Sequence, residues 1–546
     1  MSEQPTKTHR TTAADAQQLK EPWPEQWASF IGFFVYLLVL KSFFLPLFII
    51  PTGSMAETLY GAHAMHTCPN CGTEYAVGWQ QPPDGDARAA YHPVVQCPNC
   101  RWREYYGPPG SLSPMRAQPD SLLAEPLRPA AGDRIFVHGW SFDLPFARTD
   151  KLGPQRWDVV VFKVPTDGQT NYIKRLVGLP GEKIELIDGD LYVNDRLEPK
   201  SRDAQRSLWF PYYNQDFPPR RTAGRAAYCP RWVALDAGGG WSGLDTRVVR
   251  LSNPDSSPAI IQFATDVGNP SRPGVIQDVY AYNEPRTDLP GNIVTDVRLS
   301  AEVDVARLGD DGWIELHVTK GEHGFFARLT ADHWLRLEHQ PNGAADREAW
   351  DKCPWHHEDG PMHLALSHVD GRVVVEVNGR VAMESTRAQY EITPQKAATQ
   401  SAAHQPPALR IAGQNAQVTL RHLLIERDVY YTSDVRVTGG AGYAVQGHPI
   451  TLKANEYFML GDNSPNSLDA RFAFAGMHTD AVGPHLKAAA ARPEGEGRFH
   501  PGTVPGDQLI GRAFFVYWPG FMPTTPWGSG RLPNLLPDLG RTRWIH

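Results

Sequence analysis

The stretch Tyr172-Ile-Lys-Arg-Leu-Val-Gly-Leu-Pro-Gly181 has the composition of a β-strand followed by a turn. Its mainly apolar residues favour a strand, and Gly178 together with Pro180-Gly181 ends that strand. Lys174 stands inside it, although lysine side chains are rarely buried in proteins. The stretch therefore predicts either an edge strand with a solvated lysine or a strand in which Lys174 has a special use.

Several short strand patterns surround this stretch along the chain. They cover residues 134–137, 157–162, 183–187 and 191–193, and the last two flank an Asp-Gly turn. The same short strand pattern occurs at residues 456–460 and again at 513–517. We therefore expect a mainly β domain built from hairpins, which is interrupted and later resumed.

The interruption, residues 200–445, has the pattern of a separate β-sandwich. Apolar and polar residues alternate over 297–305 and again over 314–318, as is typical of strands with one buried face. A further strand, 372–377, lies between Asp-Gly and Asn-Gly dipeptides, which favour type I′ hairpin turns. These patterns predict an inserted β domain.

The inserted segment ends on a predicted pair of strands, 418–420 and 423–431. In its strand pattern and its closing Arg427-Asp-Val-Tyr-Tyr431 it resembles the concanavalin and laminin-G-like jelly rolls. Its sequence lacks the closely spaced acidic pair on one strand that glycoside hydrolysis needs, which favours a binding or spacer role with an unknown ligand. Trp241 and Trp313 are expected to pack into its core. The alternative is that they mark a site at which the sandwich docks on a polysaccharide or a protein.

Composition and charge narrow the class of partner. The 546 residues carry a formal charge of -7, with acidic and basic residues mixed along the chain. This distribution gives no basic stripe to follow a phosphate backbone, so we expect no nucleic-acid partner. The 48 glycines and 48 prolines indicate a turn-rich chain.

An apolar run near the N-terminus predicts a transmembrane helix over residues 24–46. Between Ala28 and Ile50 the only formal charge is Lys41, and a helix from about Pro24 to Phe44 spans about 30 Å, the thickness of a bilayer core. A cleaved signal peptide is the competing interpretation, but the small-x-small cleavage signature is missing. The basic residues of the preceding tail favour a cytoplasmic N-terminus. A single pass is expected because no other apolar run in the sequence is long enough to span a bilayer.

Two identical motifs, Cys68-Pro-Asn-Cys71 and Cys97-Pro-Asn-Cys100, have the spacing of metal knuckles. Four converging thiolates form a tetrahedral structural zinc site and leave no open position for catalysis. Two disulfides are the alternative in an oxidising compartment. Cys229 and Cys353 remain as a further candidate pair that the sequence alone does not assign.

Ser54, in Ile50-Pro-Thr-Gly-Ser-Met55, is the candidate nucleophile. A serine hydroxyl is scarcely ionised at neutral pH and needs an activating base. A lysine can serve as that base if burial against apolar groups lowers its pKa from about 10.4. Lys174 is the candidate for this role.

Several segments of the chain then suggest a family. They are Ile50-Pro-Thr-Gly-Ser-Met55, Gly132-Asp-Arg-Ile-Phe-Val137, Trp157-Asp-Val-Val-Val-Phe162, Tyr172-Ile-Lys-Arg175, Gly178-Leu-Pro-Gly181, and Gly461-Asp-Asn463 with Ser467, Asp469 and Arg471. In this order, behind a transmembrane helix, they resemble bacterial type I signal peptidase, the leader peptidase. The resemblance covers residues 28–65, 130–198 and 450–519. It leaves out the cysteine knuckles and the sandwich, which look like insertions into that family's β-fold.

The resemblance implies a role for each matching residue. Ser54 would be the acylating nucleophile and Lys174 its general base, a Ser/Lys dyad. The main-chain N–H of Ser54 and the hydroxyl of Thr52 would form the oxyanion hole, and Ser467 would hydrogen-bond and orient the Lys174 amine. The supporting residues would be an Asp469–Arg471 ion pair and the strand-shaping Gly461, Asp462 and Asn463.

Two positions depart from the family pattern. Glu57 stands where the family usually has proline, which places a carboxylate near the nucleophile. Ala470 replaces the usual serine of Asp-Ser-Arg. Both substitutions leave the dyad intact, so they bear on rate and specificity more than on activity.

The leading hypothesis is a membrane-bound signal peptidase I, a serine endopeptidase of the cytoplasmic membrane whose catalytic domain lies on the extracytoplasmic face. Its partners would be precursor proteins that carry signal peptides, and its only expected metal would be structural zinc. The alternative is a catalytically degenerate, membrane-anchored binding protein that uses the sandwich. A third hypothesis keeps the enzyme and lets the sandwich restrict its substrates.

The predicted organisation follows from these assignments. It comprises a cytoplasmic tail (1–23), a transmembrane helix (24–46), a catalytic domain in two parts (47–65 with 130–198, and 450–519), a cysteine-knuckle insert (66–106), a linker (107–129), the inserted sandwich (200–445) and a C-terminal tail (520–546).

Overall fold

The computed structural model of the chain is mainly β, as predicted, with most strands antiparallel. Its helices include α1 (Trp23–Val39), α2 (Arg202–Leu208) and α3 (Pro394–Ala403). The structure describes residues 23–39, 41, 45–79, 94–105, 121–122, 130–142, 153–165, 168–220, 231–235, 239–264, 274–283, 291–341, 344, 346–356, 360–403, 405–433, 442–472, 500, 502–519 and 539–546.

Strands from both ends of the chain form one sheet, the core sheet. Its order is β1 (Leu47–Ile49), β7 (Arg134–His138), β29 (Leu509–Trp518), β8 (Val159–Lys163), β9 (Asn171–Gly178), β27 (Glu456–Leu460) and β28 (Val504–Pro505), with β30 (Arg543–Trp544) beside β29. Strand β9 lies between β8 and β27, so Lys174 is not on a solvated edge. The strand pattern at 172–178 therefore belongs to the interior of the sheet.

A second sheet packs with the core sheet. Its strands, in order, are β12 (Arg196–Leu197), β11 (Asp190–Val193), β10 (Lys183–Ile187) and β26 (Ile450–Thr451). Ile184 and Leu186 of β10 share one apolar cluster with Val177 and Phe458 of the core sheet. The predicted Asp188-Gly189 turn joins β10 to β11, and both residues have the positive φ of a type I′ turn.

The two cysteine motifs lie at the tips of two small hairpins, the cysteine ribbon. The first hairpin pairs β2 (His63–Thr67) with β3 (Glu74–Gly78), and the second pairs β4 (Val94–Gln96) with β5 (Arg103–Tyr105). Strand β6 (Ser121–Leu122), inside the predicted linker, runs parallel to β5. The residue after each second cysteine, Gly72 or Arg101, has positive φ, so the two knuckles turn alike.

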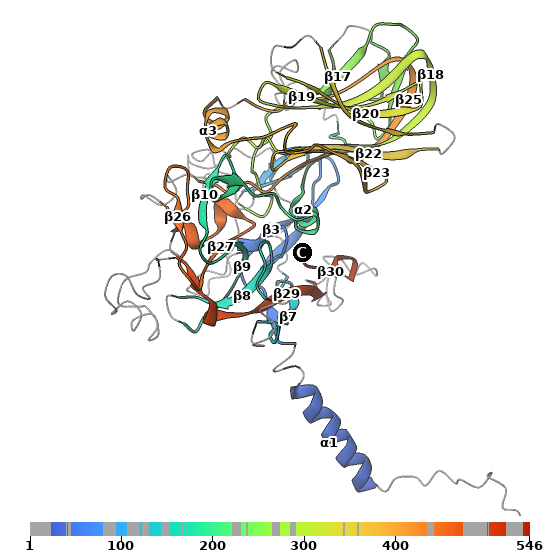
Figure 1. The fold of residues 1–546 in the computed structure, drawn as a ribbon. Coiled ribbons are helices and arrows are strands. Elements are labelled where there is room, and N and C mark those ends of the chain that lie inside the picture. The colour runs from blue at the N-terminus through green and yellow to red at the C-terminus, as the bar shows by residue number, and fades with distance from the viewer. Residues whose placement is uncertain are drawn as a thin grey trace, which may run out of the picture.

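Residues between β12 and β26 form the sandwich at the far end of the molecule from α1 (Figure 1). Its strands are β13 (Phe210–Asn214), β14 (Trp232–Ala234), β15 (Trp241–Ser242), β16 (Val249–Asn253), β17 (Ala259–Phe263), β18 (Val297–Lys320), β19 (His323–Thr330), β20 (Trp334–Gln340), β21 (Glu348–Pro354), β22 (Met362–Val369), β23 (Arg372–Val377), β24 (Arg380–Glu384) and β25 (Leu409–Arg427). The inward residues form one large apolar cluster. The predicted type I′ turns at 370–371 and 378–379 are confirmed by their positive φ angles.

One prediction within the sandwich was wrong in detail. The segments 418–420 and 423–431 are not a strand pair, because 418–427 belongs to the single long strand β25. The alternating segments 297–305 and 314–318 are strand, as predicted, and both lie in β18. Register shifts between β18 and β25 absorb the irregular residues between the two apolar patterns, so the strands stay paired along most of their length.

Trp241 packs against the sandwich core as predicted. Trp313 is only partly buried, and the Arg328 guanidinium lies 4.2 Å from its ring centre.

The apolar N-terminal segment forms α1, a helix of 17 residues. Many of its large apolar side chains are exposed, Phe33 and Ile31 among them. Among the residues that the structure describes, no helix has both the length and the apolar character needed to cross a bilayer. The predicted end of the helix falls partly on residues 40 and 42–44, which lie outside the described residues.

The last residues of the chain are not the tail that the sequence predicted. Strand β30 extends the core sheet, and Arg541 donates hydrogen bonds to the buried carboxylate of Asp133 at 3.2 and 3.4 Å. The His546 carbonyl accepts a hydrogen bond from Arg175 Nη1 at 2.8 Å. A buried carboxylate requires a cationic partner, which explains why residues 539–546 return to the sheet.

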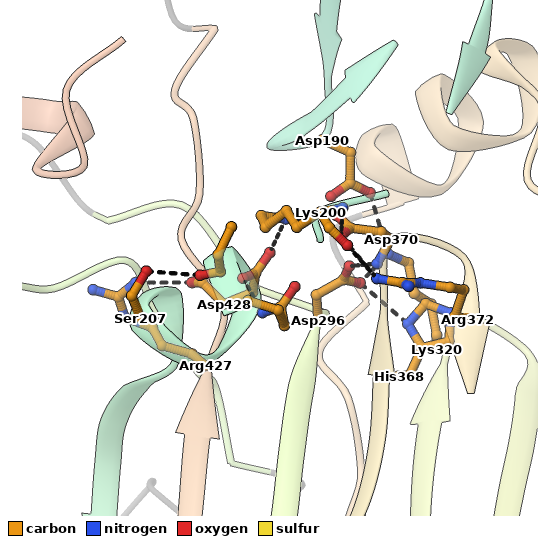
Figure 2. Close-up of polar contacts among 12 residues, drawn as sticks. Asp190, Lys200, Ser207, Asp296, Lys320, His368, Asp370, Arg372, Arg427 and Asp428 are labelled. Carbon is orange, nitrogen blue, oxygen red and sulfur yellow. Dashed lines mark hydrogen bonds and ion pairs between the residues drawn. The ribbon is translucent and has the colours of Figure 1, made fainter. Parts of the chain in front are cut away.

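A buried ionic cluster joins the second sheet to the sandwich. Figure 2 shows Lys200 beside the carboxylates of Asp370 and Asp428, to which its Nζ is bound at 2.5 and 2.6 Å. Lys320 and His368 both bind Asp296. Burial disfavours the Lys200 ammonium, but the Asp370 and Asp428 carboxylates outweigh it and raise the pKa of Lys200 overall.

The same cluster contains four aspartates whose oxygens lie within 4.8 Å of one another: Asp190, Asp296, Asp370 and Asp428. The Lys200 and Lys320 ammonium groups bind these carboxylates directly and neutralise part of their charge. The cluster is thus an internal ion network that fastens the two parts together.

Candidate active site

Ser54 and Lys174 come together from two separate elements. Ser54 lies in the short 3₁₀ turn η2 (Gly53–Met55) after β1, and Lys174 lies in β9. Lys174 Nζ donates a hydrogen bond to Ser54 Oγ at 2.5 Å. The lysine side chain is 3% exposed, so its amine meets the hydroxyl in a largely dry environment. A hydroxyl and an amine in direct contact have the geometry of a nucleophile and its base.

The surroundings of Lys174 favour its neutral form. Burial lowers the pKa of its amine to about 8, while the carboxylates of Asp469 and Asp462 oppose this shift and Arg471 adds to it. An amine with a pKa near 8 is partly neutral in the physiological range and can accept a proton there.

Thr52 lies directly before the Ser54 turn. Its side chain is exposed, and it makes no hydrogen bond that caps the turn. The role of its hydroxyl as an oxyanion-hole donor therefore stays a prediction.

Asp469 and Arg471 form a fully buried, bidentate ion pair. Arg471 Nε and Nη2 donate to the two carboxylate oxygens at 2.9 and 2.8 Å. Arg471 Nη1 donates to the carbonyl and hydroxyl oxygens of Thr432 and to the Ser464 hydroxyl, so this nitrogen of the guanidinium also has hydrogen-bond partners. The second Asp469 oxygen accepts the main-chain N–H of Gly461 at 3.0 Å.

Residues 461–463 connect this ion pair to the Ser54 turn. A side chain on Gly461 would place its Cβ 2.5 Å from the Ser54 carbonyl oxygen, so only glycine fits. The Asn463 main-chain N–H donates to that same carbonyl at 3.1 Å. The Asn463 side-chain amide donates to the Gly53 carbonyl at 2.9 Å. These contacts fix the backbone of the turn that carries Ser54.

Asp462 has a partner that the sequence did not assign. Arg175, the residue after Lys174, binds both Asp462 carboxylate oxygens at 2.8 Å, and both side chains are fully buried. Since neighbouring residues of a strand point to opposite faces, Arg175 holds the 461–463 loop while Lys174 faces Ser54.

The predicted hydrogen bond between Ser467 and Lys174 is not formed. Within the described part of the chain, the buried Ser467 Oγ has no hydrogen-bond partner. It lies instead over Gly461, where an added Cβ would come within 2.2 Å of it. The hydroxyl is close to the turn that carries Ser54, because the same Cβ would also touch the Ser54 carbonyl.

Comparison with known proteins identifies a family. The family model described as "Signal peptidase, peptidase S26" matches residues 105–224 and 372–518, and the unmatched residues between these ranges belong to the sandwich. The chain belongs to the peptidase S26 signal peptidase family. The matched ranges include two parts of the candidate site, Lys174 and residues 461–471, whereas Ser54 lies before the first matched residue.

Curated relatives carry the same family name. The chain is 28% identical over 171 residues to signal peptidase I of Rickettsia bellii (strain OSU 85-389), which is 31% of this chain and 39% of that protein. It is 58% identical over 43 residues to signal peptidase I of Rickettsia typhi, which is 8% of this chain and 16% of the relative. The chain thus spans less than half the length of these relatives.

Solved structures are also similar to part of the chain. The carbohydrate binding module CBM66 from Bacillus subtilis covers 36% of this chain and 95% of its own, at 11% identity and a TM-score of 0.23. The endo-beta-1,3-glucanase from Pyrococcus furiosus covers 46% of this chain and 100% of its own, at 11% identity and a TM-score of 0.24.

The four cysteines of this signal peptidase family member converge on one point. All four are buried and unpaired, with their sulfurs within 4.8 Å of one another. Cys68 Sγ lies 3.5 Å from Cys100 Sγ, and Cys71 Sγ lies 3.6 Å from Cys97 Sγ. Two thiolates on one tetrahedral zinc are about 3.8 Å apart, whereas bonded sulfurs are about 2.05 Å apart. The sulfurs are thus not disulfide-bonded in this structure, and their spacing fits a possible zinc site. Cys353 is unpaired, and Cys229 lies outside the described residues.

Glu57 and Ala470 are the two departures from the family pattern, and they differ in burial. Glu57 is half-buried; desolvation raises the pKa of its carboxyl, and the charge of Arg427 partly opposes the shift. Ala470 is fully buried and packs with the apolar cluster between the core sheet and the second sheet. Among the described residues, neither side chain forms a hydrogen bond or an ion pair with the Lys174 amine.

Sequence reasoning missed one set of residues at the site. Tyr280, Tyr282 and Asn283, from the sandwich insertion, contact the segments around Ser54. No local signal marks them, because they belong to the insertion and meet the site only through the tertiary fold.

Proposed function

We propose that this protein is a signal peptidase I, a serine endopeptidase that removes signal peptides from exported precursors through Ser54 and Lys174. The observation that carries the proposal is the 2.5 Å contact between Lys174 Nζ and Ser54 Oγ around a buried amine. A degenerate scaffold has no need of a buried lysine whose charge is costly. The family of the chain supports the same reaction.

The first half of the proposed reaction makes an acyl-enzyme. Neutral Lys174 accepts the Ser54 hydroxyl proton as Oγ attacks the carbonyl carbon of the scissile bond. The tetrahedral intermediate collapses, the C–N bond breaks, and the Lys174 ammonium returns the proton to the leaving amine. The signal peptide remains as an ester on Ser54, and the mature protein departs.

The second half uses the same groups in turn. Lys174, neutral again, accepts a proton from water as the water oxygen attacks the ester carbonyl. The ester bond breaks, and Ser54 Oγ recovers the proton from the ammonium. The Ser54 N–H and the exposed Thr52 hydroxyl would stabilise the oxyanion in both halves, since donors aimed at developing charge provide a large part of such catalysis.

We extend the proposal to the membrane. Ser54 lies only 15 residues beyond the end of α1 at Val39, whose large apolar side chains are exposed. Anchored through the apolar segment, with its N-terminus in the cytoplasm, the protein would hold the dyad on the extracytoplasmic face near the bilayer. The bond to be cut in an exported precursor lies next to the same surface.

We also propose that the cysteine ribbon binds one structural zinc ion. Cys68, Cys71, Cys97 and Cys100 would hold it, and zinc would link the two hairpins. The ribbon in turn is tied to the sandwich, because Asn99 Nδ2 donates to the Phe217 carbonyl at 2.7 Å. All four positions around the ion would be filled by thiolates, so the dyad chemistry does not involve it.

The test is cleavage of a purified precursor that carries an Ala-x-Ala signal peptide by the detergent-solubilised protein. We expect one cut after the second alanine, with nearly all of the rate lost in Ser54→Ala and in Lys174→Ala. The proposal is wrong if the wild-type protein leaves several such precursors intact. It is also wrong if Lys174→Ala cleaves as fast as wild type. The binding-protein hypothesis would then replace it.

A further inference from the structure

One segment of the sandwich insertion, Tyr280–Asn283, reaches the active-site turn, and we refer to it as the strap. Tyr280 Oη donates a hydrogen bond to the Asp462 carbonyl at 2.8 Å. Tyr282 Oη donates to the Ala62 carbonyl at 2.6 Å. The strap thus contacts both the loop that supports the dyad and the segment that follows the nucleophile.

Asn283 contacts the asparagine that holds the backbone of the nucleophile's turn. Its side-chain amide and that of Asn463 form a reciprocal pair, with N···O distances of 2.7 and 2.8 Å. The second amide hydrogen of Asn463 is left for the Gly53 carbonyl, and its main-chain N–H holds the Ser54 carbonyl. Asn283 therefore fixes the orientation of the Asn463 amide, which donates directly to the turn.

Tyr282 limits where this turn can move. A Cβ added to Gly53 would lie 1.8 Å from the Tyr282 ring, so the ring packs directly against the Gly53 backbone. The same ring stacks on Tyr60, with centroids 6.0 Å apart and planes 12° apart. Close packing on this side leaves the turn no room to shift toward the insertion.

The strap is held at its root by the sandwich. Arg427, the last residue of β25, is 1% exposed and donates to the Val279 carbonyl at 3.2 Å. Its guanidinium carbon lies 4.5 Å from the centre of the Tyr280 ring. The strap is therefore a fixed extension of the inserted domain.

We infer that the insertion is part of the catalytic machinery, with Asn283 acting as a positioning residue that sets the geometry of the Ser54 turn. This inference rests on the proposed function, because it assumes that Ser54 attacks the substrate. It does not follow from the family, since the strap comes from the insertion between the two matched ranges. Attack requires the nucleophile within about 3–3.5 Å of the carbonyl, and a shift of about 1 Å can cost about 100-fold in rate.

The experiment compares Asn283→Ala with Asn253→Ala in the full-length protein. Asn253 is a buried amide whose hydrogen bonds lie within the sandwich: it donates to the Ser257 and Gly413 carbonyls and accepts from the Asp255 N–H, so it reports the general cost of losing such a group. We expect Asn283→Ala to lower kcat by about 10-fold to 100-fold with KM within about twofold, and Asn253→Ala to change neither. Hydrogen exchange of residues 52–57 should accelerate in Asn283→Ala alone, with residues 297–305 unchanged.

Each outcome bears on the inference. An Asn283→Ala variant with wild-type kcat overturns it. If the wild-type protein cleaves no precursor, the proposed function is wrong, and hydrogen exchange then tests the positioning role of Asn283 by itself. Faster exchange of residues 52–57 in Asn283→Ala supports that role, and unchanged exchange overturns it. If Asn283→Ala fails to fold, Asn283→Asp keeps the size but cannot donate to Asn463, and the same two readouts apply.

Discussion

Lys174 Nζ contacts Ser54 Oγ at 2.5 Å across 120 residues of sequence. The contact depends on two placements that are independent of each other. Strand β9 lies inside the core sheet, which buries the amine, and the 461–463 loop holds the turn that carries the hydroxyl. Either placement alone would leave a serine without a base or a lysine without a partner.

The rate should follow the ionisation of Lys174. Only the neutral amine can accept the serine proton, and burial lowers its pKa to about 8. We therefore expect kcat/KM for precursor cleavage to rise about tenfold per pH unit below pH 8 and to level off above it. The profile is measured from pH 6 to pH 10 with one precursor. A rate that is flat or falls between pH 7 and pH 8 contradicts the assignment of Lys174 as the base.

Lys174→Met should separate activity from stability. Methionine keeps the length and apolar stem of lysine but removes a charge that burial disfavours, and each pKa unit of that shift corresponds to about 1.4 kcal/mol. We expect loss of nearly all cleavage together with a thermal unfolding temperature at pH 7 equal to or higher than that of wild type. Ser54→Ala serves as the control that loses activity without removing the charge. A markedly lower unfolding temperature for Lys174→Met would show that the amine stabilises the fold.

Much of the core sheet could be predicted from the sequence, because its strands are short, apolar and bounded by turn residues. The composition of residues 172–181 predicts strand β9 and the turn that ends it, and the Asp188-Gly189 dipeptide predicts the β10–β11 hairpin. Periodicity failed where strands are longer than one apolar pattern. β18 and β25 each continue through irregular residues, since pairing with the other strand holds them in place.

The candidate site was predictable in part. The chemistry of a nucleophile and its base points to Ser54 and Lys174, the family resemblance adds the Asp469–Arg471 pair, and the structure forms both contacts. No role is predicted for Arg175, because its partner lies 287 residues away. The strap carried no signal at all, since hydrogen bonds such as Asn283 to Asn463 depend on how an inserted domain docks.

The Asp469–Arg471 ion pair should be costly to break. Both side chains are fully buried, so removal of the carboxylate leaves Arg471 with an uncompensated charge. We expect Asp469→Ala to lower the free energy of unfolding by about 3–5 kcal/mol and to abolish cleavage, because Gly461 also loses its acceptor. Chemical denaturation measures the first effect.

The matched control for that experiment is Asp195→Ala. Asp195 pairs with Lys183 at 2.7 Å, but both side chains are exposed. Water and salt screen an exposed ion pair, so it contributes little to stability and this variant should resemble wild type. Equal losses in the two variants would mean that burial of the Asp469 pair adds nothing.

The cysteine ribbon should bind one zinc ion per chain. Its four sulfurs already have the spacing of a tetrahedral site, so we expect one equivalent of zinc in protein purified without added chelator, measured by elemental analysis. Cys97→Ser should lose the metal and lower the unfolding temperature, whereas Cys353→Ser, outside the cluster, should keep both. Zinc content near zero in wild type, with the unfolding temperature unaffected by added zinc, would contradict the site.

The buried ionic cluster at the base of the sandwich should support the fold without taking part in the reaction. Lys200→Met removes the ammonium that lies 2.5 Å from Asp370 and 2.6 Å from Asp428, so Asp428 loses its ammonium partner and Asp370 keeps only the more distant Arg372 at 3.7 Å. We expect a loss of about 3–5 kcal/mol in the free energy of unfolding, measured by chemical denaturation. Lys183→Met, at an exposed position, serves as the control and should unfold like wild type. Because the cluster has no contact with Ser54 or Lys174 among the described residues, kcat measured well below the unfolding temperature should equal that of wild type. A large fall in kcat with little loss of stability would instead place Lys200 in the positioning of the dyad, through Arg427, which donates to the Asp428 carbonyl and holds the strap.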